Sequence, residues 1–268
     1  MSFAFVEQQG VKLLLPDSLS GLTAAFTTRH GGVSNGEYAQ LNIGLHVGDD
    51  DAAVIENRRR ACGALGVTFG NLVVAEQSHG PNVAVVDASF KGRGATSIDD
   101  AVPNADALIT ATPAVPLLIM VADCVPIICW DPGLKTVAAI HAGWRGTVTR
   151  VTEVAVQTMV DMGSNPRDIV ATIGPAISPS RYQVGPEVVD QANEGLGPEV
   201  SSRVIHSDGT GRYLFDLWAA NEAVLVESGL STANITTARI DSSSGDFFSD
   251  RLARPCGRFG VIVEIPAK

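Results

Sequence analysis

The sequence predicts a mixed α+β fold: a single-domain layered sandwich in which a central mixed β-sheet is flanked by helices. Short apolar runs bounded by Pro, Gly or Asp indicate buried strands over residues 107–110, 117–121, 127–130 and 137–140. A segment with apolar residues at helical spacing follows over 147–162, with Gly163 as its stop. Because no linker-like change in composition separates these elements, we expect one domain over residues 1–268.

Capping residues and further apolar runs predict the remaining elements. The aspartates at 49–51 predict the start of a helix that ends at Gly63 or Gly66. Asp216 predicts the N-cap of another helix, which ends near Glu227. Also expected are strands over 23–28, 72–75, 83–86, 169–173, 235–240 and 259–265 (the last half-buried), a helix from about residue 186, and a mobile loop over 91–104.

The composition is that of a globular protein and argues against polyanionic partners. Hydrophobic residues make up 45% and charged residues 18% of the 268 residues. The formal net charge of −10 repels nucleic acid and anionic membrane surfaces, so we expect neither as a partner. A small anionic ligand is still allowed, because a local cluster of arginines can override the global charge.

The cysteines and the amino terminus indicate a cytoplasmic protein. The four cysteines show no CxxC pairing and no density typical of a disulfide scaffold. The first residues have no basic region followed by a long apolar core, so no signal peptide is expected. The longest apolar stretch, 114–122, is interrupted by Pro116 and is too short to span a membrane. We expect a monomer or a weak homodimer with reduced thiols.

Three residues, His79, Cys124 and His141, lie in turn-forming contexts at the ends of apolar runs. Together they can supply three ligands to a zinc ion and leave a fourth position open, which is typical of a catalytic metal. They are 45 residues (79 to 124) and 17 residues (124 to 141) apart, so only the fold can bring them together. The same residues also suit a thiolate–imidazole pair with a second histidine beside it. The alternative is that these residues have no metal-binding or catalytic role: the cysteine would be a buried thiol, and the histidines would be hydrogen-bonded core residues.

A glycine-containing turn joins a strand to a helix at residues 141–147. Backbone N–H groups at a helix start attract anions, and Arg145 adds a forked cation that suits phosphate or carboxylate. The alternative is that Thr147 is an ordinary N-cap and Arg145 a surface charge. Arg29 precedes a second glycine turn, at Gly31–Gly32. The loop histidines, His30 and His46, are expected to be surface or hydrogen-bonding groups.

Several motifs occur in a fixed order along the chain: Thr27–Ser34, Leu41–Asp49, Gln77–Gly80, Ala122–Pro126, His141–Gly146 and Gly174–Ile177. Together they resemble the laccase-domain family, whose members were first called multicopper polyphenol oxidoreductases and later purine nucleoside phosphorylases. The resemblance runs from about residue 20 to the carboxyl terminus. It implies an α/β sandwich similar to that of a bacterial toxin with a cysteine–histidine deamidase site.

The resemblance also implies an activity and a set of site residues. Zinc would be bound by His79, Cys124 and His141, which are also the expected catalytic residues. Family members cleave adenosine, inosine, guanosine and methylthioadenosine with phosphate, and they deaminate adenosine. The expected partners are therefore a purine nucleoside and phosphate. We expect Arg29, Asn42 and Arg145 to contact these ligands.

Copper and other chemistry remain as alternatives. A multicopper oxidase needs on the order of ten histidines, because imidazole is the preferred copper ligand, and this chain has five. Copper could still bind at the zinc ligands, since it outcompetes zinc at most N/S sites. The alternatives are a metal-free Cys/His thiol hydrolase, a polyphenol oxidase or a small-ligand binding protein using the same pocket. The carboxyl-terminal segment 241–258 departs from the family pattern, which leaves its part in substrate binding open.

Overall fold

The computed structural model describes residues 3–267, which form two six-stranded mixed sheets in place of the single central sheet expected. The first sheet contains, in spatial order, β1 (Phe3–Gln8), β2 (Val11–Pro16), β3 (Thr23–Thr27), β15 (Phe259–Glu264), β7 (Leu117–Val121) and β4 (Val73–Val74). The second contains β14 (Ile235–Thr237), β10 (Val170–Ile173), β8 (Val125–Asp131), β9 (Thr136–Ala142), β6 (Ala107–Thr110) and β5 (Val83–Val85). Each sheet is antiparallel except for parallel pairs at its edges, β4·β7 in the first and β5·β6 and β10·β14 in the second.

The two sheets share one hydrophobic core. Phe26, Ile119 and Val261 of the first sheet pack in one cluster with Leu108 and Ile128 of the second. The next residues along β8, Ile127 and Cys129, belong to a different cluster on the opposite face. The central strands are therefore buried on both faces, which is why they read as continuous apolar runs and not as alternating ones.

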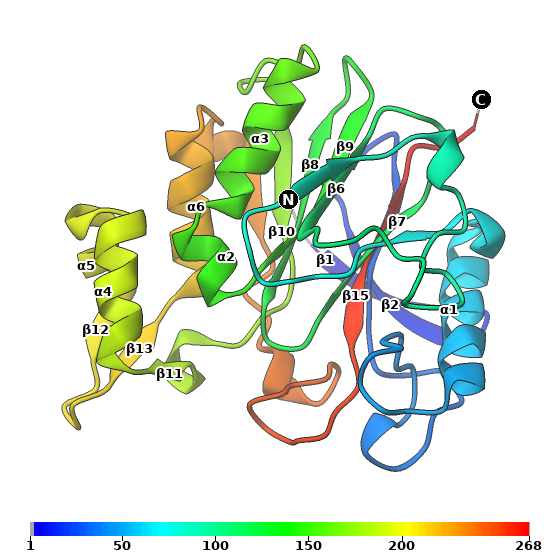
Figure 1. The fold of residues 1–268 in the computed structure, drawn as a ribbon, viewed down its shortest axis with the longest axis horizontal. Coiled ribbons are helices and arrows are strands. Elements are labelled where there is room, and N and C mark those ends of the chain that lie inside the picture. Colours follow the sequence, from blue (N-terminus) through cyan, green and yellow to red (C-terminus); the bar gives the residue numbers. More distant parts are fainter. Residues whose placement is uncertain (1–2, 268) are drawn as a thin grey trace.

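Helices cover the outer faces of both sheets (Figure 1). The helices are α1 (Asp51–Leu65), α2 (Trp144–Val148), α3 (Val151–Asp161), α4 (Pro186–Gly195), α5 (Pro198–Val204) and α6 (Leu217–Glu227). Helices α2, α3 and α6 pack on the second sheet, and α1 packs on the first. The result is a four-layer arrangement of helix, sheet, sheet and helix. No helix within residues 3–267 is both long and apolar enough to cross a membrane.

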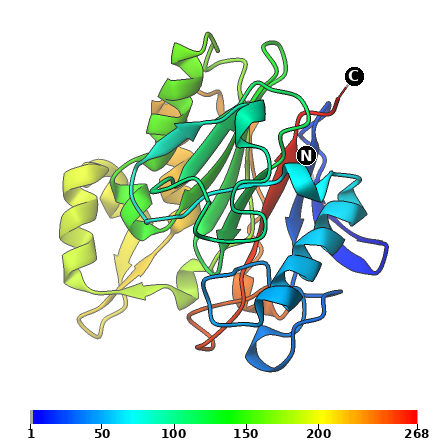
Figure 2. The same cartoon turned by 45° about the vertical axis from the view of Figure 1, so that its right-hand side comes forward.

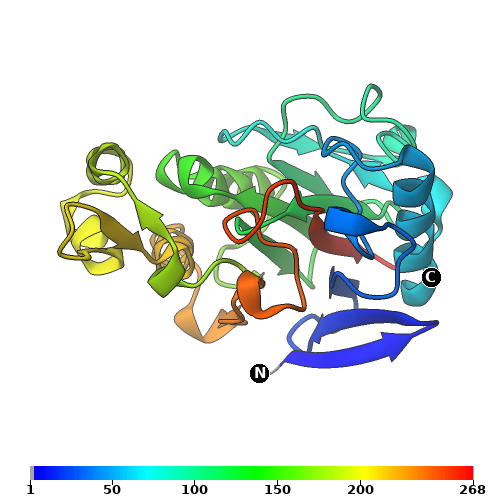
Figure 3. The same cartoon turned by 90° about the horizontal axis from the view of Figure 1, so that it is seen from below.

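A third, small sheet extends the molecule at one end. It contains β11 (Gln183–Val184), β13 (Tyr213–Phe215) and β12 (Ile205–Ser207), next to α4 and α5 (Figure 2). Figure 3 shows the carboxyl-terminal segment that precedes β15, in orange and red, lying between this small sheet and the first large sheet. Figure 1, which looks from the side, shows the same segment at the lower end of the molecule, next to the lower end of β15.

The mixed α+β class is confirmed, and most elements lie where the sequence predicts them. Helix α1 has Asp50 as its N-cap and ends at Gly66, which adopts φ 70°. Helix α6 begins at Asp216, whose side chain accepts from the Ala219 N–H at 2.9 Å. The N-terminal hairpin, α5 and the small sheet were not expected. Strand β15 is buried along its whole length, contrary to the half-buried pattern expected, because both of its faces contact core clusters.

The helix expected over 147–162 is in fact two helices. Arg150 adopts φ 61°, a left-handed conformation that an α-helix cannot contain, so the chain breaks between α2 and α3. Helix α2 begins at Trp144 with Gly143 as its N-cap, and Thr147 is an internal residue. Arg145 consequently lies in the first turn of a helix only five residues long, so the helix dipole adds little to its charge.

A fully buried arginine on α1 ties three segments together. Arg58 donates from Nε to the Ile43 carbonyl at 2.8 Å and from Nη1 to the carbonyls of Gly94 and Ala95 at 2.6 and 3.0 Å. Its Nη2 lies 3.5 Å from Met120 Sδ. Burial lowers the pKa of Arg58 to about 10, so the guanidinium remains a cation at neutral pH.

Candidate metal site and its cavity

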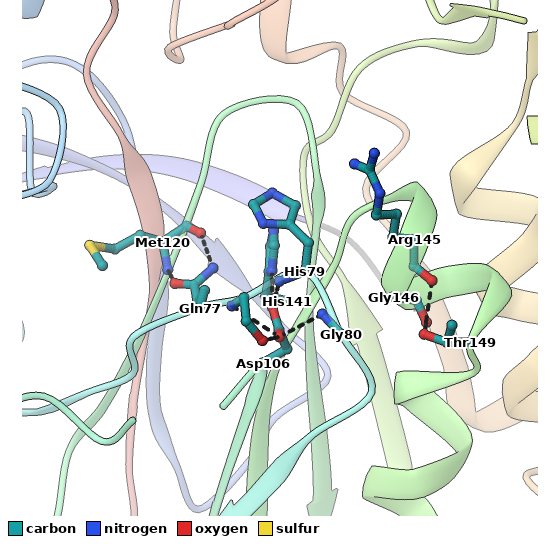
Figure 4. A network of polar contacts seen from close by, with 10 residues as sticks. Gln77, His79, Gly80, Asp106, Met120, His141, Arg145, Gly146 and Thr149 are labelled. Carbon is teal, nitrogen blue, oxygen red and sulfur yellow. Dashed lines mark hydrogen bonds and ion pairs between the residues drawn. The ribbon is translucent and has the colours of Figure 1, made fainter. Parts of the chain in front are cut away.

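The structure brings His79, Cys124 and His141 together from three separate segments. His79 lies between β4 and β5, Cys124 in the turn between β7 and β8, and His141 at the end of β9. Their ligand atoms all lie within 4.8 Å of one another. The two imidazole rings meet edge to face, with centroids 4.6 Å apart (Figure 4). We call these three residues the triad.

Asp106, which sequence reasoning missed, organises the triad from below. Its Oδ1 lies 2.7 Å from His141 Nδ1 and accepts the backbone N–H of His79 at 2.9 Å. Its Oδ2 accepts from the Ser78 hydroxyl at 2.9 Å and from the Gly80 N–H at 2.8 Å (Figure 4). Burial favours the neutral acid, but the hydrogen bond and charge of His141 outweigh it and lower the pKa of Asp106 to about 2. The carboxylate therefore orients His141 through Nδ1 and leaves Nε2 for a metal.

Two further residues set the position of the His79 loop. The Gln77 side-chain amide donates to the Met120 carbonyl at 2.7 Å and accepts from the Met120 N–H at 2.8 Å, so the loop is fixed to the end of β7 (Figure 4). Gly143 lies against the triad: a Cβ there would come within 2.9 Å of Cys124 Sγ and 3.2 Å of His79 Cδ2. Only glycine leaves room for the three ligands at this point.

Cys124 and His141 each stabilise the charged form of the other. Burial raises the pKa of a thiol, but the neighbouring His141 and His79 outweigh it and lower the pKa of Cys124 to about 6. Burial lowers the pKa of His141, yet Cys124 and Asp106 outweigh it and raise that pKa to about 9. In the metal-free protein this favours a thiolate–imidazolium pair at neutral pH.

The triad fits a zinc ion. Catalytic zinc takes three protein ligands, among them thiolates and imidazoles, with ligand atoms about 3.3–3.8 Å apart at the corners of a tetrahedron. The observed separations of up to 4.8 Å are close to that spacing. The low pKa of Cys124 supplies the thiolate, and the Asp106 carboxylate supplies the usual partner of a metal-bound histidine. The same donors can bind copper, so the identity of the metal is not set by this geometry.

A cavity of about 580 Å³ opens over the triad, a size typical of small-molecule sites. Ile98, Met120 and Val121 contribute apolar surface, and Trp144 and Tyr182 contribute aromatic rings. The cavity is also lined by four arginines, Arg145, Arg251, Arg254 and Arg258, and by three acids, Glu76, Asp123 and Asp250. Asp250 pairs with Arg254 and Asp123 accepts two hydrogen bonds, so the other arginines remain available to an anionic ligand.

Of the three residues expected to contact substrate, one lines the cavity and two do not. Arg145 lines the cavity and lies over the Trp144 ring, 4.4 Å from its centroid. Arg29 and Asn42 are not among the lining residues. Arg29 donates from two nitrogens to the Ala39 carbonyl, at 2.9 and 2.6 Å, and lies over the Phe248 ring.

Asn42 is fully buried and its side chain is occupied within the protein. The amide donates to Asp49 Oδ2 at 2.9 Å and accepts from the Arg258 N–H at 2.8 Å. Asn42 therefore holds the 41–49 loop to Arg258, the residue that precedes β15. The structure brings only Arg145 of the three expected residues into the cavity with the triad.

Asp123 brings the carboxyl-terminal segment to the site. This buried residue precedes Cys124, and its Oδ1 accepts from the Ser242 hydroxyl at 2.6 Å. Its Oδ2 accepts from the Arg251 backbone N–H, also at 2.6 Å. Residues of the segment 241–258, among them Arg251, thus line the cavity. A sequence signal for this contact was lacking, because Asp123 and Arg251 are far apart in the chain.

Comparison with known proteins identifies the family. The chain matches the family model described as multi-copper polyphenol oxidoreductase laccase over residues 23–266. A purine nucleoside phosphorylase, YlmD of Geobacillus stearothermophilus, is 39% identical over 240 residues, which cover 88% of this chain and 86% of the relative. An adenosine deaminase, RL5, from an unknown prokaryotic organism is 36% identical over 90% of this chain and 92% of its own.

A solved structure has the same fold as this chain. The crystal structure of YlmD from Geobacillus stearothermophilus matches with a TM-score of 0.93 and 35% identity, over 98% of this chain and 99% of that one. The fold described above is thus shared with a solved structure along almost the whole chain. The expectation of an enzyme is confirmed as well, since curated relatives of this similarity are named phosphorylase and deaminase. The chain belongs to the multi-copper polyphenol oxidoreductase laccase family of enzymes.

Proposed function

We propose that this protein is a zinc-dependent purine nucleoside phosphorylase of the cytoplasm that also deaminates adenosine. Its substrates would be adenosine, inosine, guanosine and methylthioadenosine. The observation that carries the proposal is the triad, with its Asp106 partner, opening into a cavity that is both apolar and cationic. The names of the relatives, a phosphorylase and a deaminase, support both reactions.

Each part of the site has a separate task. Zinc bound by His79, Cys124 and His141 would supply a Lewis acid that polarises an oxygen at the open position. Asp106 holds His141 in one tautomer and orientation, so the imidazole does not need to reorganise during turnover. The apolar residues Ile98 and Met120 offer a surface for the purine and keep water from it.

The two reactions differ in the group that attacks. In phosphorolysis a phosphate oxygen bonds to the ribose C1′, and the C1′–N9 bond breaks with its electron pair leaving on the purine. In deamination water adds at C6 of adenosine and the amino group leaves as ammonia, so that inosine forms. Phosphorolysis needs a cation for the phosphate dianion, and Arg145 in the cavity suits that role. Deamination has no such requirement.

Replacement of the shared ligand tests the proposal. Cys124→Ala should abolish both activities and the retention of zinc together, because thiolate and metal are lost in one step. The measurements are metal content by mass spectrometry and turnover of adenosine with and without phosphate. Cys62→Ala is the matched control, since it removes a buried thiol that belongs to α1 and does not line the cavity. Phosphorolysis that persists in metal-free Cys124→Ala would sink the proposal.

The thiolate–imidazolium pair favours one other candidate, a metal-free thiol hydrolase. With its pKa lowered to about 6, chiefly by His141 against the effect of burial, Cys124 would be a nucleophile at neutral pH without metal. That enzyme would be inactivated by iodoacetamide and indifferent to chelators. The zinc enzyme would lose activity in a chelator and regain it when zinc is added, so one pair of assays separates the two.

A further inference from the structure

Arg251 enters the cavity on a fixed backbone and keeps part of its guanidinium free. Asp123, the neighbour of Cys124, accepts the Arg251 backbone N–H at 2.6 Å, so the position of Arg251 is tied to that of a triad residue. The Arg251 side chain donates from Nη1 to the carbonyls of Arg181 and Gln183, at 3.3 and 3.1 Å. Within residues 3–267 it makes no ion pair, and its Nε and Nη2 have no hydrogen-bond acceptor.

Tyr182 lies beneath this guanidinium and offers a free hydroxyl. The Arg251 Cζ is 5.1 Å from the centroid of the Tyr182 ring, and the ring is also packed against Phe215. Tyr182 lines the cavity with Cys124, yet among the described residues its hydroxyl has no hydrogen-bond partner. Burial raises the pKa of Tyr182, so the phenol keeps its proton and can donate it to an anion.

Arg145, like Arg258, is a further cation of the cavity that has no acidic partner among the described residues. Its contact is with the Trp144 ring, and the ion pairs among residues 3–267 do not include it. Arg145, Arg251 and Tyr182 line the same cavity as Cys124. Arg254, in contrast, is exposed and paired with Asp250.

We propose that Arg251, Tyr182 and Arg145 form an oxyanion subsite that binds inorganic phosphate beside Cys124. The Arg251 nitrogens and the Tyr182 hydroxyl would donate to phosphate oxygens, and Arg145 would balance the second charge of the dianion. The proposal rests on the phosphorolysis proposed above, and it assigns the co-substrate to residues outside the sequence motifs of the triad. Asp123 then links the subsite to the metal ligand, because one side chain anchors Arg251 and the next residue is Cys124.

The test compares phosphate binding with a reaction that uses none. Tyr182→Phe removes only the hydroxyl and keeps the packing, and Arg251→Lys keeps a charge but loses the fork. For the zinc-loaded protein we would measure the Kd of inorganic phosphate by calorimetry, the KM for phosphate, and adenosine deamination in phosphate-free buffer. Arg181→Gln is the matched control, because its side chain pairs with Asp241 and does not line the cavity.

The expected result is a larger Kd and KM for phosphate in both variants: about five- to tenfold for Tyr182→Phe and ten- to a hundredfold for Arg251→Lys. Deamination should change by a much smaller factor, and Arg181→Gln should resemble the wild type. The subsite would be overturned if both variants bound phosphate as tightly as the wild type. It would also be overturned if deamination fell by the same factor as phosphate affinity.

The failure of the subsite and that of the proposed reaction can be told apart. If the wild type cleaves nucleosides with phosphate while both variants bind phosphate normally, the subsite is wrong and the reaction stands. If the wild type binds phosphate, loses that binding in the variants and cleaves no nucleoside, the subsite stands and the reaction is wrong. A wild type that does not bind phosphate at all would overturn the subsite directly.

Discussion

The two sides of the cavity are built in different ways. The triad side is carried by strand ends, and its central carboxylate, Asp106, accepts four hydrogen bonds in addition to the contact with His141. The arginine side, which consists of Arg145, Arg251 and Tyr182, comes from a short helix, a turn and the carboxyl-terminal segment. Those residues are held mainly by backbone contacts and ring stacking.

This difference suggests how the site divides its tasks. A metal site requires ligand positions accurate to a fraction of an ångström, and a buried carboxylate with a full set of donors provides that accuracy. Substrate contacts can vary between relatives without disturbing the metal, provided that they sit on segments outside the sheets. Three substitutions test this division.

The largest effect is expected on the triad side, from Asp106→Asn. The carboxylate has a pKa of about 2, because His141 outweighs the effect of burial, so at neutral pH the change removes a charge. The amide nitrogen would also oppose donors that the carboxylate now accepts, such as the Gly80 N–H. Zinc affinity should fall about ten- to a hundredfold, as for other partners of metal-bound histidines.

Competition with a chromophoric chelator measures that affinity. Asp87→Asn is a suitable control, because Asp87 also accepts from a following N–H but is exposed and has no contact with the triad. Zinc affinity equal to that of the wild type in Asp106→Asn would show that the triad does not depend on this carboxylate.

On the arginine side, Arg145→Lys should affect one reaction more than the other. The ammonium keeps the charge but loses the bidentate fork, and Arg145 is exposed, so we expect the lower end of the range for such a pair. The KM for phosphate should rise about tenfold, a loss of about 1.4 kcal/mol, while zinc content stays the same. Steady-state kinetics of both reactions provide the measurement, with the exposed Arg203→Lys on α5 as control. An equal loss of phosphorolysis and deamination would mean that Arg145 supports the fold instead.

The smallest effect is expected from Ser242→Ala, which loosens the anchor of the carboxyl-terminal segment. It removes one of the two hydrogen bonds to the buried Asp123 and leaves that oxygen without a donor. Unfolding free energy should fall by about 1–2 kcal/mol, and the KM for phosphate should rise a few-fold. Urea denaturation and kinetics measure the two effects.

Ser243→Ala serves as the neighbouring control, because the Ser243 hydroxyl bonds to Asp241 and not to Asp123. Zinc affinity should be unchanged in both variants. If it fell together with phosphate affinity in Ser242→Ala, the two sides of the cavity would not be independent.

The part of the site that was predicted from sequence is the part marked by local signals. His79, Cys124 and His141 stand at the ends of apolar runs beside turn residues, so each could be selected without knowledge of the fold. Asp106 gives no such signal: it is one more acid next to a strand, and its contact with His141 arises only when β6 pairs with β9. Arg29 also stands beside a glycine turn, but its guanidinium donates to the Ala39 carbonyl and it does not line the cavity.

The division of the strands between two sheets also could not be predicted from the sequence. Strands buried on both faces show the same apolar run whichever sheet they join, so the runs of β7 and β8 do not reveal that these neighbours in sequence lie in different sheets. Strand β15 pairs with β3 and β7, and those pairings are set by packing across the whole chain. Local capping, in contrast, marked the ends of α1 and α6 correctly.

The buried guanidinium of Arg58 has a consequence for the behaviour of the cavity in salt. It lies behind Met120, which lines the cavity, and all of its hydrogen-bond partners are uncharged. Mobile ions weaken the field of exposed charges such as Arg145 within a Debye length, but they cannot enter a packed core. The contribution of Arg58 to the attraction of anions should therefore depend less on salt than that of the exposed Arg145, and the equally buried carboxylate of Asp106 opposes it.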